Sequence, residues 1–416
     1  MLQGAVIDED SRRTAERVAR ESYGKLVAFL SARTRDVAGA EDALSQAFAA
    51  ALVDWPRSGV PANPEGWLMT VARRKQIDAA RQRHTSDAAA EQLRYLSEMS
   101  VEGAGEDERI PDERLALMFV CAHPAIDAGI RAPLMLQAVL GFDAAAIASA
   151  FLISPTTMGQ RLVRAKTKIK QAGIPFRVPA RDELPERLAA VLDAIYAAYA
   201  EGWTDPTGTD PRRRNLADEA IWLGRLVASL LPDEPESLGL LSLMLHSHAR
   251  RKARRNHAGD YVPLAEQDPA DWDAPMIDEA DALLQQAAGK NTIGRYQLEA
   301  AVQSAHVVRR HGRDADWEAI EQLYGALLSI TGSPVVGVNH AVAVAQIRGA
   351  AAGLELLDQL KNDPRLAEYQ PYWAARADLL ARAGDGEGED HAFERAIGLE
   401  RDQSVSAFLQ RRRDVL

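Results

Sequence analysis

Apolar residues recur at steps of three and four along most of this chain, the spacing that places them on one face of an α-helix. Residues 12–35 and 38–56 both show this pattern, the second of them from Ala43 to Leu52. Runs rich in Val, Ile, Thr and Tyr, which favour β-strands, are scarce. The pattern therefore predicts an all-α protein.

A proline- and glycine-rich stretch, WPRSGVPANP, separates the second of these segments from a strongly basic one. Proline cannot donate the next helical hydrogen bond, so Pro56 is expected to end its helix. Asn63 followed by Pro64 predicts the start of another helix, with Asn63 as its N-cap, running to about Arg83. Its cations form either a solvated face that pairs with Asp78 or a surface that meets a polyanion. These cations are Arg73, Arg74, Lys75, Arg81 and Arg83.

Residues 86–112 are acidic and rich in small residues, a composition that predicts a linker. The block that follows, 113–178, contains two helices joined by a short turn, with Asp143 and Ser154 in the positions of N-caps. This arrangement predicts a helix-turn-helix, whose second helix enters the DNA major groove, although an ordinary helical hairpin with a basic end is the alternative. The polar and basic side chains that suit base edges and phosphates are Ser154, Thr156, Thr157, Gln160, Arg161, Arg164, Lys166 and Lys168.

The charge of the chain divides at the end of this block. Residues 1–178 hold 23 Lys and Arg against 22 Asp and Glu, whereas residues 179–416 hold 26 against 38. Only the first part is therefore expected to meet a polyanion.

Residues 179–416 show one helical pattern after another. The segment PYWAARADLLARAGDGEGEDHAFERAIGLERD predicts an Ala-rich helix, a Gly-rich turn and a second helix, and it is similar to a tetratricopeptide (TPR) unit of about 34 residues. Aromatic residues such as Tyr199, Trp222 and Tyr324 are expected to pack between helix pairs, and a concave ligand-binding surface is the alternative.

The sequence contains no convincing group of catalytic or metal-binding residues. His246, His248 and His257 lie in HSHARRKARRNH, but two histidines at i and i+2 point to different sides of a helix, so a solvated basic helix end is favoured over a metal or phosphate site. The single cysteine, Cys121, has apolar neighbours and is expected to be a core residue rather than a nucleophile paired with His123. No phosphate-binding glycine motif is present. No cofactor and no metal are therefore expected.

Neither a membrane segment nor a secretion signal is evident. No apolar run approaches the roughly 18 residues that a bilayer requires, and the start MLQGAVIDED lacks a basic and then apolar signal. The sequence favours a cytoplasmic protein with no membrane partner.

In their order, these elements resemble bacterial RNA polymerase sigma factors of the extracytoplasmic-function (ECF) type. AEDALSQAFAAAL, the proline-rich loop and NPEGWLMTVARRKQIDAAR look like region 2 of that family, and LISPTTMGQRLVRAKTKIKQAGIPFRVP looks like its region 4. The C-terminal part is similar to the helical TPR-like extension of one ECF group. The resemblance implies region 2 in residues 1–85, an acidic linker in 86–112, a helix-turn-helix region 4 in 113–178 and the extension in 179–416.

The resemblance also implies a role for each region. Region 2 would dock on the clamp helices of core RNA polymerase through Glu41, Asp42, Gln46, Phe48 and Leu52. It would hold the melted promoter −10 element through Trp55, Ser58, Asn63, Arg73, Arg74, Lys75, Gln76, Arg81 and Arg83. Region 4 would contact the polymerase flap and read the −35 element through the side chains from Ser154 to Lys168 named above. The polymerase performs the chemistry in this family, so the resemblance implies no catalytic residue and no enzymatic activity.

Two alternatives stay open. The chain could be a helix-turn-helix regulator or scaffold that binds duplex DNA without polymerase, and binding to core polymerase would distinguish this from a sigma factor. The C-terminal extension either regulates the sigma regions by contacting them within the chain or completes the holoenzyme.

Overall fold

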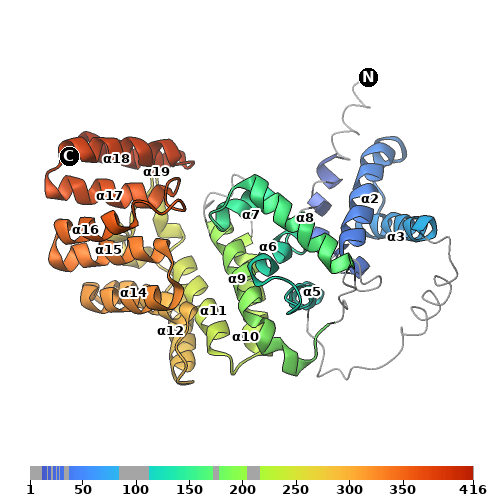
Figure 1. The fold of residues 1–416 in the computed structure, drawn as a ribbon, viewed down its shortest axis with the longest axis horizontal. Helices are drawn as coiled ribbons and strands as arrows, with labels where there is room; N and C mark the ends of the chain where they lie inside the picture. The colour runs from blue at the N-terminus through green and yellow to red at the C-terminus, as the bar shows by residue number, and fades with distance from the viewer. Residues whose placement is uncertain are drawn as a thin grey trace. The chain divides into compact units, whose positions relative to one another are not determined.

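The chain is built from α-helices joined by turns and loops, as the apolar pattern predicts (Figure 1). Among the residues that the structure describes, no strand occurs, and a single β-type bridge joins Arg255 and Tyr261. No helix of the described residues combines the length and the apolar character that crossing a membrane requires. The helices form two compact units, residues 1–198 and residues 199–416. The structure, a computed structural model, describes residues 12–31 in part, 37–83, 112–171, 178–203 and 216–415.

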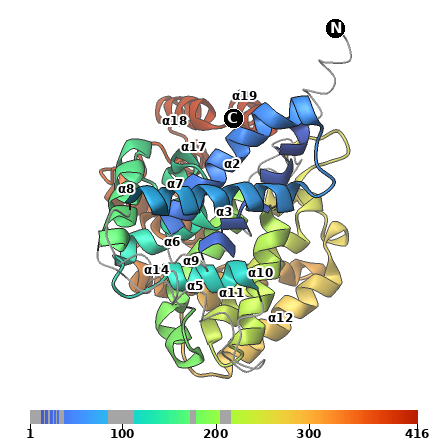
Figure 2. The same ribbon diagram turned by 90° about the vertical axis from the view of Figure 1, so that its right-hand side faces the viewer.

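The N-terminal unit begins with helical stretches between residues 12 and 31, followed by α2 (Val37–Ser58) and α3 (Pro64–Arg83). α2 and α3 pack against each other, and Figure 2 shows α3 passing across α2. Leu44 of α2 and Leu68 of α3 are fully buried. The two helices therefore share an apolar core.

The loop between α2 and α3 is shorter than expected. The prediction that Pro56 ends α2 is wrong, because the helix continues to Ser58. Proline removes one backbone donor, which costs little near a helix end, and the amide of Gly59 still donates to a carbonyl of the last turn at 2.9 Å. Asn63 caps α3 as predicted, since its Oδ1 accepts a hydrogen bond from the Gly66 amide at 2.9 Å.

The two helices that the sequence assigns to a helix-turn-helix are α7 and α8, and both predicted caps are in place; their role as a DNA-binding motif stays a prediction. The Asp143 side chain accepts hydrogen bonds from the amides of Ala145 and Ala146, and Ser154 Oγ accepts one from the amide of Thr157 at 3.2 Å. α6 packs against both helices and is mostly buried, so it supports the motif from within. The four helices of this block are α5 (Glu113–Cys121), α6 (Ala128–Ala138), α7 (Ala144–Ala150) and α8 (Pro155–Gln171).

The N-terminal unit extends into α9 (Leu184–Trp203), which follows the 3-10 turn η2 (Arg181–Glu183). Arg187 is 3% exposed, and it donates to the carbonyl of Phe119 at 3.2 Å and to the Glu183 carboxylate at 3.3 Å. This guanidinium connects the start of α9 to the end of α5.

The C-terminal unit is organised around α11 (Pro235–Ala249), which packs against α10, α12 and α13. Residues 237–246 are all buried, as expected for a helix that is surrounded by others. Glu236 accepts hydrogen bonds from the amides of Tyr296 and Gln297, at 2.9 and 3.2 Å, so it caps the start of α13. The other elements of this part are α10 (Leu216–Leu230), η3 (Lys252–Arg254), η4 (Leu264–Glu266), η5 (Pro269–Asp271), α12 (Ala274–Ala288), α13 (Arg295–Val307) and η6 (Val308–His311).

The remaining helices pack in chain order, each against the next, and Figure 1 shows α14 to α18 stacked side by side. α17 and α18 form the helix pair that the sequence predicts. Gly384 makes the turn between them with a φ of 78°, and Phe393 in their core is 1% exposed. The likeness to a TPR unit stays a prediction. The six helices are α14 (Trp317–Thr331), α15 (Pro334–Arg348), α16 (Ala350–Leu360), α17 (Gln370–Ala383), α18 (Gly386–Leu399) and α19 (Gln403–Val415).

Candidate nucleic-acid and polymerase interface

The residues predicted to bind polymerase lie on two sides of α2. Helical geometry places Glu41, Phe48 and Leu52 on one flank, with Asp42 and Gln46 about 100° further round, on the exposed side. Leu52 is 49% exposed, whereas the side chain of Glu41 is only 12% exposed. We call the flank with Glu41, Phe48 and Leu52 the α2 flank. It is exposed to solvent at Leu52 and covered at Glu41.

Three residues predicted to hold the −10 element make contacts within the protein. Trp55 is 1% exposed and packs edge-on against Trp67, with ring centroids 5.5 Å apart. Ser58 donates to the carbonyl of Asp54 at 2.8 Å, and the side chain of Asn63 caps α3. The placement of Trp55 in an exposed loop is thus wrong, because α2 continues through it and directs its ring into the core. A contact between Trp55 and a base stays a prediction and requires this end of α2 to rearrange.

The basic face of α3 is exposed where the structure describes it. Arg74 and Lys75 are both exposed. Within the described residues Arg74 has no ion-pair partner, so the alternative in which Asp78 pairs with it is not observed. Positive charge on this face is available to a polyanion.

Other cations of α3 are placed differently. Arg73 lies over the ring of Phe29, with its Cζ 5.0 Å from the ring centroid, and Gln76 is half-buried. The side chains of Arg81 and Arg83 lie outside the described residues. The structure therefore brings Arg74 and Lys75 to the surface and turns Arg73 toward the preceding helical segment.

The residues predicted to read the −35 element divide between two flanks of α8. Met158 and Leu162, which are 1% and 2% exposed, mark its inner side, and Ser154 caps its first turn. At about 100° per residue, Lys166 falls on one flank and the other side chains fall on the outer side or the opposite flank. The outer side and the opposite flank together are called the DNA face below, after the predicted role of their residues. This face carries Thr156, Thr157, Gln160, Arg161, Arg164 and Lys168.

A pocket of about 350 Å³ lies along this DNA face. Apolar residues from the start of α6, the residues just before it and α8 line it, together with the cations Arg161, Arg164 and Lys168 and the carboxylate of Asp127. The DNA face thus combines positive charge with an apolar recess.

Lys166, on the other flank, forms an ion pair with Glu41 of α2. The two side chains are 22% and 12% exposed, and Oε1 of Glu41 is buried without a hydrogen-bond partner among the described residues. Burial raises the pKa of Glu41, and the Lys166 ammonium opposes this increase. Cys121, a buried core residue as predicted, lies close to both charges, and burial raises the pKa of its thiol to about 12. A residue predicted to bind polymerase is thereby joined to one predicted to bind DNA.

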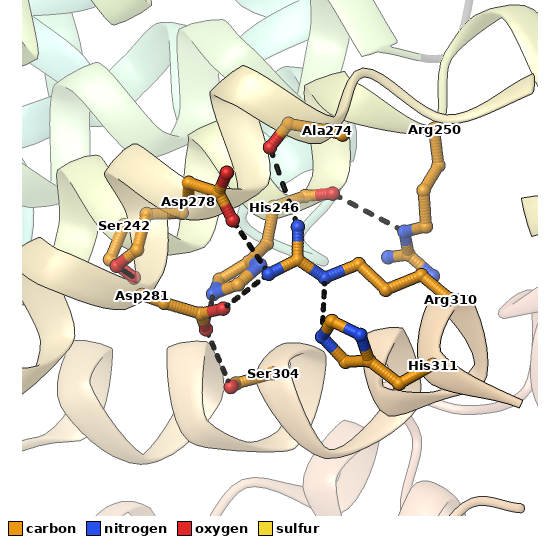
Figure 3. A network of polar contacts seen from close by, with 10 residues as sticks. Ser242, His246, Arg250, Ala274, Asp278, Asp281, Ser304, Arg310 and His311 are labelled. Carbon is orange, nitrogen blue, oxygen red and sulfur yellow. Dashed lines mark hydrogen bonds and ion pairs between the residues drawn. The ribbon is translucent and has the colours of Figure 1, made fainter. Parts of the chain in front are cut away.

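A polar network in the C-terminal unit connects α11, α12 and α13 (Figure 3). Asp281 accepts a hydrogen bond from Ser304 Oγ at 2.8 Å, and its Oδ1 lies 3.3 Å from Nε2 of His246. Arg310 adds ion pairs with Asp278 at 2.7 Å and with Asp281 at 3.5 Å. Because the Ser304 hydroxyl donates to a carboxylate rather than to His246, the group lacks the base-activated hydroxyl of a nucleophile. The network connects helices.

The interpretation of HSHARRKARRNH as a solvated helix end is wrong for two of its residues. His246 is 0% exposed and Arg250 is 7% exposed. Arg250 donates to the carbonyl of His246 at 3.3 Å and to the side chain of Gln303, and burial lowers the pKa of Arg250 to about 10. The apolar run that precedes His246 is the sequence signal for this burial. Trp222, by contrast, was expected to pack between helices and is 42% exposed.

Comparisons with known proteins bear on both units. Residues 18–85 match the sigma-70 region 2 family, and residues 187–288 match a family of unknown function, DUF6596. The chain is 38% identical over 382 residues to uncharacterized protein R00370 of Rhizobium meliloti (strain 1021), which covers 91% of this chain and 90% of that protein. No solved structure matches the chain.

Proposed function

The chain belongs to the same family as protein R00370 of Rhizobium meliloti and carries sigma-70 region 2, and we propose on this basis that it is a sigma factor of the ECF type. In this role it binds core RNA polymerase and directs transcription to specific promoters. The observation that supports the proposal is the order of two elements in one compact unit: sigma-70 region 2 precedes the helix pair α7 and α8, and the outer face of α8 is basic. A regulator that binds duplex DNA by itself needs only the second element.

Regions 2 and 4 hold different forms of DNA in this proposal. Arg74 and Lys75 of α3 contact phosphates of the melted −10 strand, where a single strand offers both charge and unstacked bases. α8 enters the major groove at the −35 element, with Gln160 directed to base edges and Arg164 to phosphates. The open end of the α2 flank, at Leu52, contacts the polymerase clamp. The contact of region 4 with the polymerase flap stays a prediction, and polymerase supplies the catalysis.

Reconstitution with core RNA polymerase tests the proposal. The purified chain is mixed with core polymerase, the complex is isolated by pull-down, and run-off transcripts are measured on genomic fragments. Transcripts that require both components support a sigma factor. Tight binding to duplex DNA with no association with polymerase would instead establish the helix-turn-helix regulator.

Arg74→Glu separates the DNA contact from polymerase binding. This charge reversal on an exposed side chain should reduce open-complex formation, because it replaces attraction to the −10 strand by repulsion, and should leave core binding near that of the wild type. Lys361→Glu, which reverses an exposed charge in the C-terminal unit, is the matched control. An equal loss of core binding and opening in Arg74→Glu would argue against a DNA role for α3.

We propose that the acidic C-terminal helices regulate the sigma regions. The net charge of +1 for residues 1–178 and −12 for residues 179–416 motivates this role. A truncated chain should end at Ala198, the last residue of the N-terminal unit. A chain that ended at Val178 would lack Arg187 and its hydrogen bond to the carbonyl of Phe119. Unregulated transcription by the truncated chain would establish inhibition by the extension, and loss of transcription would show that the extension is required.

A further inference from the structure

Arg250, at the end of α11, is a buried cation without a carboxylate partner. It is 7% exposed, its Nε donates to the carbonyl of His246 at 3.3 Å, and its Nη2 donates to the side-chain oxygen of Gln303. Within the described residues no carboxylate lies at ion-pair distance from it. Figure 3 shows the contrast with Arg310, which reaches two carboxylates. Buried charges are ordinarily paired, because burial removes their hydration.

Contacts within the chain compensate the charge of Arg250 only in part. The carbonyl of His246 lies in the last turn of α11, where the helix dipole favours a cation. Carbonyl and amide oxygens carry only partial charges, however. Burial is the main influence on Arg250 and lowers its pKa to about 10, and the side chains that act on it next are Tyr199, Arg254 and Tyr324, none of them a carboxylate. The negative charge that would balance Arg250 is thus left for a ligand to supply.

Two further polar groups lie beside Arg250. Its charge acts on the ring of His306 in α13 and on the hydroxyl of Tyr324 in α14. Both side chains are half-buried, and within the described residues neither they nor Nη1 of Arg250 has a hydrogen-bond partner. None of these atoms is among the polar atoms that are fully enclosed by the protein. Glu299 also acts on Tyr324, but its carboxylate is paired with Arg295 at 2.7 Å.

The charges and rings around these groups favour a small organic acid as the ligand. Burial, with the charges of Arg250 and Arg309, lowers the pKa of His306 to about 4, so its ring is neutral at pH 7. One cation among neutral donors matches a singly charged carboxylate better than a doubly charged phosphate. Trp317 packs edge-on against His306, with ring centroids 5.5 Å apart, and Tyr324 adds a second aromatic ring. Such rings suit the apolar part of an organic acid.

We propose that the C-terminal unit binds a small organic acid whose carboxylate pairs with Nη1 of Arg250 and accepts hydrogen bonds from Tyr324 and His306. The ligand supplies the negative charge that is missing at the end of α11, and it joins α11, α13 and α14. Such a site gives the C-terminal helices a chemical signal to which they respond. Its existence does not depend on whether the chain is a sigma factor.

Isothermal titration calorimetry of the full-length chain at pH 7 tests the site with two probes, benzoate and inorganic phosphate, at constant ionic strength. Benzoate should bind to one site per chain, at least tenfold more tightly than phosphate. Arg250→Met should weaken benzoate binding by about tenfold to 100-fold, because it removes the charge that pairs with the carboxylate. Arg376→Met is the matched control and should leave the affinity unchanged, because Arg376 already pairs with Asp358 at 2.7 Å.

A second variant separates ligand binding from a structural role of Arg250 at the helix end. Tyr324→Phe retains the packed ring and removes a hydroxyl that has no partner within the described residues, so it should fold as the wild type does and bind benzoate about tenfold more weakly. Circular dichroism verifies the folding of each variant.

Three results would contradict the proposal. Absence of saturable benzoate binding to the wild type would overturn the site, and so would wild-type affinity in both Arg250→Met and Tyr324→Phe. Tighter binding of phosphate than of benzoate would overturn the assignment to an organic acid. Polymerase and DNA are absent from these titrations, so a failure of the proposed function would leave their outcome unchanged.

Discussion

The two flanks of α8 predict which of its cations set the salt dependence of DNA binding. Arg161, Arg164 and Lys168 lie on the DNA face, whereas Lys166 pairs with Glu41 on the other side. Each phosphate that a cation neutralises contributes about 0.9 to the slope of log affinity against log salt for duplex DNA. If each of the three contacts one phosphate, changing all three to Ala should reduce the slope by about 2.7.

This difference is large enough to measure. Between about 50 and 200 mM salt, a slope larger by about 2.7 corresponds to an additional loss of affinity of about 40-fold in the wild type. Lys168→Ala alone should reduce the slope by about 0.9. Lys166→Ala removes the same charge from the same helix and should leave the slope unchanged, which makes it the matched control.

Fluorescence anisotropy with a duplex of about 20 base pairs and arbitrary sequence is sufficient, because the electrostatic contribution does not depend on sequence. The affinity of each full-length variant is measured over a series of salt concentrations. A reduction of the slope by Lys166→Ala equal to that by Lys168→Ala would refute the assignment of flanks. A triple variant with the wild-type slope would remove α8 from the phosphate contacts.

Three stability predictions follow from single contacts. Asp143→Ala should reduce the free energy of unfolding by about 1 kcal/mol through loss of the α7 cap, and Asp143→Asn should retain most of it, as urea unfolding will show. Phe393→Ala should cost about 3–5 kcal/mol by opening a cavity between α17 and α18, and a loss below 1 kcal/mol would contradict the tight packing of that pair. Burial, with the charges of Arg250 and Arg309, lowers the pKa of His306 from 6.5 to about 4. Because the folded state favours the neutral ring, the contribution of His306 to stability is complete above pH 6.5, and the free energy of unfolding decreases by up to about 3 kcal/mol as the pH falls from 6.5 toward 4. His306→Gln should remove this pH dependence from the free energy of unfolding measured in urea.

Contacts between residues close in sequence could be predicted from the sequence. The caps at Asn63, Asp143 and Ser154 each join a side chain to an amide two or three residues later, so the order of residues alone defines them. The burial of Cys121 followed from its apolar neighbours. Pro56 gave a wrong prediction of the end of α2, which continues to Ser58. The energetic cost of the backbone N–H that proline lacks depends on how close the residue is to the helix end.

Contacts between distant segments could not be predicted in this way. Glu41 and Lys166 are 125 residues apart, and each is an ordinary charged residue of an amphipathic helix until the two helices meet. The burial of Trp55 likewise depends on how α2 packs, not on the loop residues that follow it. The polymerase-binding set on α2 and the DNA-binding set on α8 therefore stay predictions, and the sequence did not indicate that a residue of one set pairs with a residue of the other.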